Sequence, residues 1–405
     1  IKCLGEEITF HPSMHKQILM NWLESINIDW PISRRRYYGT EIPIWYCKKC
    51  SEPHVPEPGK YYRPWEEKCP INNCIKCDST EFVGEERTFD TWMDSSVSPL
   101  FISKFNRDEE FFKKVYPTSI RPQAKDIVRT WLYYTLLRCE QLTGKKPWSE
   151  AWVMGYGLDE KGMKMSKSKG NAIDPLPVIE KLGADTFRFW SASEINHGYD
   201  FRCNEQKIES TKKFLSKLWN VSRFLSSFPV IESGKPSASD KWILSELDKL
   251  VKECKRGYEE YNFFIPAIAI REFTWNVFAA HYIEMVKARA YGIEFSDEER
   301  DGAIFTLHKT LSTILKLLAP ITPFITEYLW KELYSKDSIH KEKQVEPENI
   351  EEQSNVTKEI SEFNSKVWNE KKSQNLSLKD SIKIEIPESL EPFKKDLKSM
   401  HNLLD

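Results

Sequence analysis

Four cysteines of this chain form two closely spaced pairs. Cys47-Lys-Lys-Cys50 and Cys74-Ile-Lys-Cys77 are Cys-x-x-Cys pairs in a stretch that is otherwise typical of loops. Such pairs allow four thiolates to surround one ion in the tetrahedral geometry that zinc prefers. We therefore predict a closed, structural Zn²⁺ site formed by Cys47, Cys50, Cys74 and Cys77. The alternative is four unrelated buried cysteines, and Cys69 is an ambiguous fifth thiol.

A second stretch concentrates lysines and hydroxyl groups between two glycines. It reads Lys161-Gly-Met-Lys-Met-Ser-Lys-Ser-Lys-Gly-Asn171. Lys164 and Lys167 can act as point charges on a polyphosphate, and Ser166 adds a hydroxyl donor. Such groups stabilise negative charge that moves toward a leaving group during displacement. The pattern predicts a loop over residues 160–171 that closes on phosphates; the alternative is a solvated basic loop.

Strands and helices alternate through the first half of the chain, which positions these residues in an α/β domain over residues 1–204. A zinc-binding insertion is expected at about residues 45–80. The individual elements expected are a helix over His15–Ile26, a strand over Ile42–Cys47, a buried helix over Pro122–Thr143, a strand over Ala151–Leu158 and a helical pair ending at Ser193.

After about Asn204 the pattern changes to long amphipathic helices, which predicts an all-α bundle over residues 205–335. The helices expected are Glu205–Ser227, Lys241–Tyr258, Pro266–Tyr291, Arg300–Leu318 and Phe324–Tyr334. Residues 336–405 are predicted to hold a polar linker and a small α/β unit, because Ser381-Ile-Lys-Ile-Glu-Ile alternates as a strand does.

Composition restricts the class of protein further. The 405 residues include 40% hydrophobic and 30% charged residues, and no apolar run is long enough for a membrane span. A formal net charge of −2 argues against a protein that coats nucleic acid without specificity. Nine cysteines without a secretory signal fit a reducing compartment, so we expect a soluble, cytoplasmic protein. The first residue, Ile1, suggests a chain cut from something longer.

The loop over residues 160–171 resembles the signature loop of class I aminoacyl-tRNA synthetases. Lys164-Met-Ser-Lys-Ser, with Gly170-Asn171 and Asp174-Pro175, has the form found in the valyl, isoleucyl and leucyl branch. Segments over residues 32–39, 42–47, 89–96 and 126–131 resemble this branch in the same order. The resemblance implies a Rossmann-like catalytic half, then a bundle that binds the anticodon stem of tRNA. It also implies ATP with Mg²⁺ and an amino acid as substrates.

Within the branch, the resemblance is to the valyl pattern. Asp90-Thr-Trp92 and Asp126-Ile127 with Trp131 carry it. It implies that Trp92, Ile127 and Trp131 line a pocket for valine, that Asp126 binds the ribose of ATP, and that the tRNA is tRNA(Val). Without the resemblance, the apolar residues would be interpreted as core and Asp126 as a helix cap. Relatives usually have glycine at the position of Ala124.

Two features of the family are missing from this sequence. No pair of histidines matches the His-Ile-Gly-His motif, and the inserted editing domain is absent. The resemblance therefore implies a fragment that is inactive alone and that needs the N-terminal half of the enzyme as a partner. The tail and Arg121-Pro-Gln look more archaeal than bacterial. The alternatives are an isoleucyl-type synthetase and a non-catalytic tRNA-binding module or subunit.

Several basic residues of the bundle are candidates for tRNA phosphate contacts, although a solvated helix face is the simpler interpretation of each one. They are Lys212, Lys213, Arg223, Arg271, Lys287 and Arg289.

Overall fold

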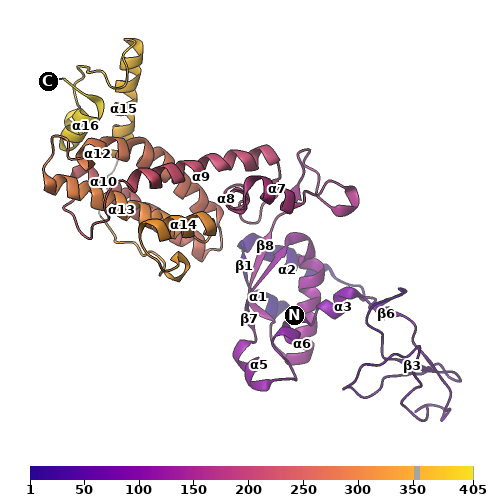
Figure 1. Ribbon diagram of the computed structural model, residues 1–405. Coiled ribbons are helices and arrows are strands. Elements are labelled where there is room, and N and C mark those ends of the chain that lie inside the picture. The colour runs from indigo at the N-terminus through magenta and orange to yellow at the C-terminus, as the bar shows by residue number, and fades with distance from the viewer. Residues whose placement is uncertain (351–355, 405) are drawn as a thin grey trace. The chain divides into compact units, whose positions relative to one another are not determined.

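The computed structural model describes residues 1–350 and 356–404. The chain divides into two compact units, Ile1–Gly155 and Tyr156–Asp405 (Figure 1). Among the described helices, none is both long and apolar enough to cross a membrane.

The first unit is built on a parallel sheet of three strands in the order β1-β8-β7. The strands are β1 (Thr9–His11), β8 (Trp148–Met154) and β7 (Thr118–Ala124). Helices α2 (Lys16–Ser25) and α6 (Tyr133–Thr143) pack beside the sheet (Figure 1), where Leu19 and Leu136 share a buried cluster with Trp148 and Val153. The predicted α/β architecture is confirmed in this unit. Short helices complete it: α1 (Lys2–Glu6), α3 (Thr91–Ser95), α4 (Ser98–Ile102) and α5 (Glu109–Val115).

The predicted helix over Pro122–Thr143 begins too early. Residues up to Ala124 belong to β7, which pairs with β8 from Thr118↔Trp148 to Ala124↔Met154. A 3-10 turn (Lys125–Ile127) and a π-helical segment (Val128–Leu132) then lead into α6. Pro122 fits a strand here because β7 lies at an edge of the described sheet, where one side needs no amide donor.

The cysteine-rich segment of the first unit forms a small antiparallel sheet in the order β4-β3-β5. Its strands are β3 (Trp45–Cys47), β4 (Pro53–His54) and β5 (Phe82–Gly84), and long loops connect them. A second pair, β2 (Ser33–Arg34) with β6 (Thr88–Phe89), flanks this sheet in sequence on both sides. The strand predicted over Ile42–Cys47 is confirmed only for Trp45–Cys47, which form β3.

The second unit begins with the lysine-rich loop and the elements that support it. β9 (Gly157–Leu158) pairs in parallel with β10 (Phe201–Arg202). Between them lie the loop, a 3-10 turn (Lys167–Lys169), α7 (Pro175–Leu182) and α8 (Ala184–Glu194). A buried cluster of Val178, Leu182 and Trp190 joins these helices to Ile208 of α9 (Glu205–Leu225).

A helical bundle makes up most of the second unit, as predicted. Its core is formed by α9, α10 (Ala238–Glu259), α11 (Phe264–Glu272), a π-helical segment (Phe273–Tyr282), α12 (Ile283–Ala290), α13 (Asp297–Leu318) and α14 (Pro323–Leu333). The helix expected over Pro266–Tyr291 therefore contains a π-helical interruption. Residues 348–350 are held on α10, because Asp248 accepts hydrogen bonds from the amides of Glu348 and Ile350 at 2.6 and 3.1 Å.

The strand predicted at Ser381–Ile386 is wrong. That stretch makes only an isolated bridge between Ile382 and Leu403. Its alternation is real, but the inward-facing Ile382, Ile384 and Ile386 pack on the helical core and not on a partner strand. The tail is therefore helical, with α15 (Val356–Ser373), a 3-10 stretch (Glu388–Phe393) and α16 (Lys394–His401). Part of the predicted linker, residues 351–355, lies outside the described residues.

Candidate functional site

The lysine-rich loop has an alternating backbone that separates its buried and exposed side chains. Lys164 forms an isolated antiparallel bridge with Leu158, and the Met165 amide donates to the Gly157 carbonyl at 3.0 Å. Met165 packs against the cluster that joins α7, α8 and α9, and a Cβ at Gly157 would lie 2.7 Å from its Cε. Since side chains alternate along an extended chain, Met165 fixes the loop while Lys164 faces outward.

Asp159 and Asn171 link the two ends of the loop. The Asn171 amide group donates to Asp159 Oδ2 at 2.9 Å, and Asn171 Oδ1 accepts from the Ser166 amide at 3.0 Å. Asp159 Oδ1 also accepts from the Met163 amide at 2.8 Å. The hydrogen bonds from Asn171 and then Met163 hold the pKa of Asp159 below its usual value. An ionised Asp159 therefore helps to fix the shape of the loop.

The cationic side chains of this loop lie at the surface. Lys164 Nζ lies 4.0 Å from the centre of the Tyr156 ring, a cation–π contact. Lys167 is exposed in the short 3-10 turn, which ends at Gly170 with a φ of 67°. Ser166 Oγ lies 3.3 Å from Ser168 Oγ. The structure thus brings Lys164, Ser166 and Lys167 together on one loop that can receive an anion.

Trp92 lies in the first unit on the short helix α3. Asp90 caps this helix by accepting from the Trp92 amide at 3.0 Å, and the same carboxylate forms an ion pair with Arg34. The Trp92 ring is half-buried, with its centre 5.9 Å from that of Tyr134. Tyr134 in turn stacks on Trp30 at 3.7 Å. Trp92 is therefore part of an aromatic group and not a deeply buried core residue.

Trp131 is more deeply buried than Trp92. Its ring is 7% exposed and lies between Trp148, with ring centres 5.7 Å apart, and the Arg121 guanidinium at 3.9 Å. Its Nε1 donates to Ser95 Oγ of α3 at 3.1 Å. Because α3 also carries Trp92, the structure places Trp92 and Trp131 on neighbouring elements.

Ile127 and Asp126 follow the carboxyl end of β7 in the 3-10 turn. Ile127 packs against the buried cluster that contains Trp131, whereas Asp126 is exposed. Ligands of open parallel sheets commonly bind at the carboxyl ends of the strands. The positions of both residues are compatible with that rule.

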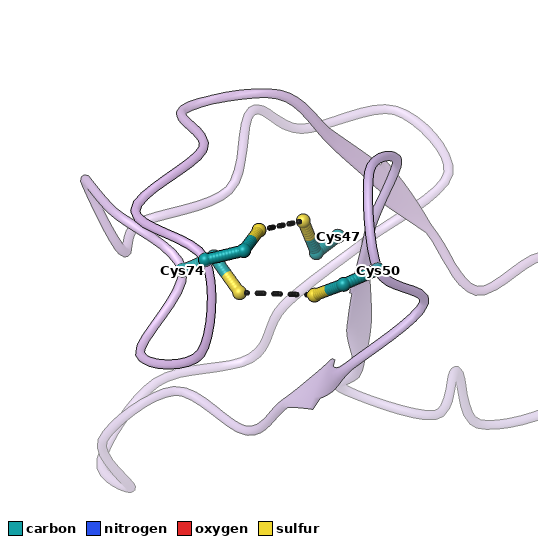
Figure 2. Close-up of side chains that lie close together, drawn as sticks. Cys47, Cys50 and Cys74 are labelled. Carbon is teal, nitrogen blue, oxygen red and sulfur yellow. Dashed lines mark hydrogen bonds between the residues drawn. The ribbon is translucent and has the colours of Figure 1, made fainter.

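The four predicted cysteines converge. Their sulfur atoms all lie within 4.8 Å of one another. Figure 2 shows the labelled side chains of Cys47, Cys50 and Cys74 turned toward the centre of this group. The Cys47–Cys77 and Cys50–Cys74 sulfur distances are both 3.5 Å. A tetrahedral zinc with bonds of about 2.3 Å separates its sulfurs by roughly 3.8 Å. The group therefore fits zinc with little movement.

The two cysteine pairs sit in similar turns. The Ser51 amide donates to the Cys47 carbonyl at 2.8 Å, and the Asp78 amide donates to the Cys74 carbonyl at 2.9 Å. Each turn ends in a residue with positive φ, 58° at Ser51 and 60° at Asp78. Burial raises the pKa of Cys47, but the backbone amides that point at its sulfur outweigh burial and lower it to about 6. Cys69 lies outside the convergent group.

His54 is a residue at this centre that the sequence analysis missed. It is 4% exposed, its Nε2 lies 3.3 Å from Cys74 Sγ, and its ring packs edge-on against Phe82. Its nitrogen is not within ligand distance of all four sulfurs. His54 therefore contacts one of the four cysteines and lies outside the convergent group. The sequence spacing between a cysteine and a histidine that contacts it is not fixed. Only knowledge that β3 pairs with β4 would have placed His54 beside the cysteines.

Comparison with known families assigns two segments. Residues 2–203 match the family of tRNA synthetases class I (I, L, M and V), and residues 240–386 match the anticodon-binding domain of tRNA ligase. The chain therefore belongs to the class I tRNA synthetases of this group. The predicted resemblance is confirmed.

Several valine–tRNA ligases are among the similar curated proteins. The valine–tRNA ligases of Aeropyrum pernix, Nanoarchaeum equitans and Pyrobaculum aerophilum are 42%, 43% and 44% identical to this chain. These matches cover 99%, 100% and 99% of this chain's length. The chain spans only 50%, 53% and 52% of these relatives.

Solved structures support the fold alone. The LeuRS of Agrobacterium radiobacter K84, in a ternary complex with tRNA and LeuAMS, matches 82% of this chain and 45% of its own, with a TM-score of 0.62 at 21% identity. Methionyl-tRNA synthetase of Mycobacterium tuberculosis, with methionyl-adenylate, matches 80% of this chain and 58% of its own, with a TM-score of 0.60 at 19% identity.

Proposed function

We propose that this chain is the part of a valine–tRNA ligase that carries the lysine loop, the valine-selecting aromatic residues and the tRNA-binding bundle. The observation that carries the proposal is the loop over residues 160–171, which Asp159 and Asn171 link at its ends and which exposes Lys167. The names and identities of the relatives support valine over isoleucine as the amino acid.

In the proposed reaction, a valine carboxylate oxygen attacks the α-phosphorus of ATP. A new P–O bond forms, the bond to the β,γ-diphosphate breaks, and valyl-adenylate and pyrophosphate result. Lys164 and Lys167 hold the phosphates and stabilise the negative charge that gathers on the departing pyrophosphate, while the Ser166 hydroxyl donates to a phosphate oxygen. Mg²⁺ accompanies the ATP and neutralises part of its charge. A hydroxyl of the terminal ribose of tRNA(Val) then attacks the carbonyl carbon of valyl-adenylate, so that an ester bond forms, the bond to the phosphate breaks and AMP leaves.

The residues of the first unit would recognise the two substrates. Trp92, Ile127 and Trp131 would line the side-chain pocket for valine, and Asp126 would bind the ribose of ATP. The contacts of Trp131 with Arg121, Trp148 and Ser95 support a rigid wall in this place. A rigid apolar wall discriminates by size, because a pocket that cannot expand excludes the extra methylene of isoleucine.

The cysteine group would hold a structural Zn²⁺ ion. Cys47, Cys50, Cys74 and Cys77 would occupy all four positions, and a closed site of this kind organises its loops and binds no substrate.

The test is amino-acid-dependent exchange between ATP and pyrophosphate, measured on the enzyme that contains this chain together with any partner polypeptide. We expect exchange with valine in preference to isoleucine and threonine. Lys167→Ala should reduce it by about a hundredfold or more, since the lost charge acts on the transition state. Lys169→Ala, an exposed lysine in the same turn, is the matched control and should remain near the parent rate.

The other outcomes decide between the alternatives. A preference for isoleucine would assign the chain to an isoleucyl-type synthetase. Absence of exchange with every amino acid, together with retained tRNA binding, would favour a non-catalytic tRNA-binding module.

A further inference from the structure

Helix α9 lies between the two segments that the family comparisons match, at residues 2–203 and 240–386, so neither match assigns it. Its sequence is unusual in charge. From Ser210 to Ile231 the chain contains four basic residues and no acidic one. This stretch is a local positive region in a chain whose net charge is −2. A polyanion is the partner that such a region complements.

The structure also separates the six basic candidates of the bundle into two groups. Arg289 is buried in ion pairs with Asp240 and Asp396, Arg271 pairs with Glu272, and Lys287 pairs with Glu284. By contrast, the salt bridges of the described residues include none from Lys212, Lys213 or Arg223. All three of these side chains are exposed, and all three lie on α9.

An exposed aromatic pair accompanies these charges. Trp219 of α9 and Tyr328 of α14 stack with ring centres 5.5 Å apart and planes inclined by 23°. They remain 42% and 53% exposed. Trp219 and Arg223 also line a groove of about 210 Å³ between the two helices, with Ser226, Tyr328, Leu333 and the acidic Glu332. Exposed aromatic rings beside unpaired cations are a common way to bind a base or ribose next to its phosphate.

Helix geometry places these groups in one row. Lys212, Trp219 and Arg223 are seven and four residues apart, which brings them to one face of α9 over a length of about 16 Å. Figure 1 shows α9 running along the bundle as one continuous helix, so the row is straight.

We propose that Lys212, Lys213, Trp219 and Arg223 of α9, with Tyr328 of α14, form a tRNA-binding surface, here called the α9 surface. The cations contact successive phosphates of the tRNA backbone, and the exposed rings pack against a ribose or an unpaired base beside them. This inference rests on the proposed function for the identity of the partner.

The experiment measures tRNA(Val) affinity of the enzyme that contains this chain, at several salt concentrations. Arg223→Ala should weaken binding roughly tenfold at low salt, as expected for one charge-assisted hydrogen bond. It should also reduce the slope of log Kd against log salt concentration by about one. Lys212→Ala/Lys213→Ala should reduce that slope by about two. Tyr328→Ala should weaken binding with little change in slope, because it removes stacking and no charge.

The matched control is Lys366→Ala/Lys372→Ala on α15, two exposed lysines of the same unit. These substitutions should change neither affinity nor slope by more than twofold. Loss of affinity in the α9 variants with normal valine-dependent exchange in the absence of tRNA supports the α9 surface. Unchanged affinity and slope in Arg223→Ala and in the double variant would overturn it, even if exchange with valine stands. Absence of exchange in the parent enzyme would instead reject the proposed function.

Discussion

The cysteine-rich segment and the helical bundle differ in what holds them together. Between residues 45 and 84, Trp45 is the one large apolar side chain that the described structure buries completely, whereas Val55, Trp65 and Ile75 are exposed. The bundle instead buries a continuous apolar core from α9 to α16. That core also encloses a buried ion pair between Arg289 and Asp240. We therefore predict that the segment depends on its proposed metal ion for stability, whereas the bundle depends on packing.

Metal removal should produce the largest difference between the two regions. Structural zinc contributes an apparent free energy of about 10–16 kcal/mol in small metal-dependent domains. A strong chelator should therefore unfold residues 45–84 and leave the bundle intact. Hydrogen exchange should rise within the segment, while the helical circular dichroism signal should change little.

Cysteine substitutions provide the control for this prediction. Cys74→Ser should reproduce the effect of the chelator, whereas Cys69→Ser should retain one zinc ion per chain because Cys69 lies outside the convergent group. Loss of zinc in Cys69→Ser would show that the ligand set is wrong.

In the bundle, the largest effect should come from Arg289. Its Nη1 and Nη2 donate to the two Asp240 oxygens at 2.7 and 2.8 Å, and its Nε donates to Asp396 at 3.1 Å. Arg289→Ala leaves two carboxylates buried without their cation, which should cost about 3–5 kcal/mol of unfolding free energy. Urea unfolding of the parent and the variant measures this loss of stability. Lys287→Ala, which breaks an exposed pair three residues apart, should cost less than about 1 kcal/mol. Equal costs for the two variants would contradict this account.

Acid should weaken the bundle through His401. Burial, then the charge of Lys371 and the nearby His281, lowers the pKa of His401 to about 4. Its Nε2 donates to Asn364 Oδ1 at 2.8 Å, which requires no second proton. Between pH 6.5 and 4 the unfolded chain binds more protons at this site than the folded chain, so stability falls as pH falls.

The expected loss is about 2–3 kcal/mol of unfolding free energy between pH 7 and pH 4. His401→Gln removes the titrating group and should flatten the pH profile of stability by that amount. The same pH slope in parent and variant would assign the acid sensitivity to other groups.

Both regions show which features the sequence could specify. The cysteine spacing correctly predicted that four thiols converge, because each short Cys-x-x-Cys turn fixes its own geometry. Metal binding by this group stays a prediction. Long amphipathic helices were predictable because the helical repeat of apolar residues is visible within each helix's own sequence. The role of Arg289 was not, since an arginine on a helix has the same local pattern whether it faces water or the acids of Asp240 and Asp396.

The wrong secondary-structure predictions have one physical origin: the local sequence does not show which distant segment a stretch packs or pairs with. The alternation of Ile382, Ile384 and Ile386 correctly indicated one buried face, but helices cover that face. Pro122 was assigned to a helix because pairing with β8 lies in another part of the sequence. The roles of Trp92, Asp126, Ile127 and Trp131 stay predictions, because the structure gives their positions and not their ligands.

The smallest effect, and the sharpest test of metal dependence, concerns Ser51. Its φ of 58° lies in the left-handed region, which costs a residue with a Cβ about 1 kcal/mol. Ser51→Gly removes that cost and should raise zinc affinity about threefold to fivefold in competition with a chelator. Asp78→Gly relieves a similar φ but loses the hydrogen bond from Asn73 to Asp78 at 3.2 Å, so its gain should be smaller. If the proposed zinc site couples folding of this segment to metal binding, relief of backbone strain appears as higher metal affinity. An unchanged affinity in Ser51→Gly would mean that the segment is already folded without its metal.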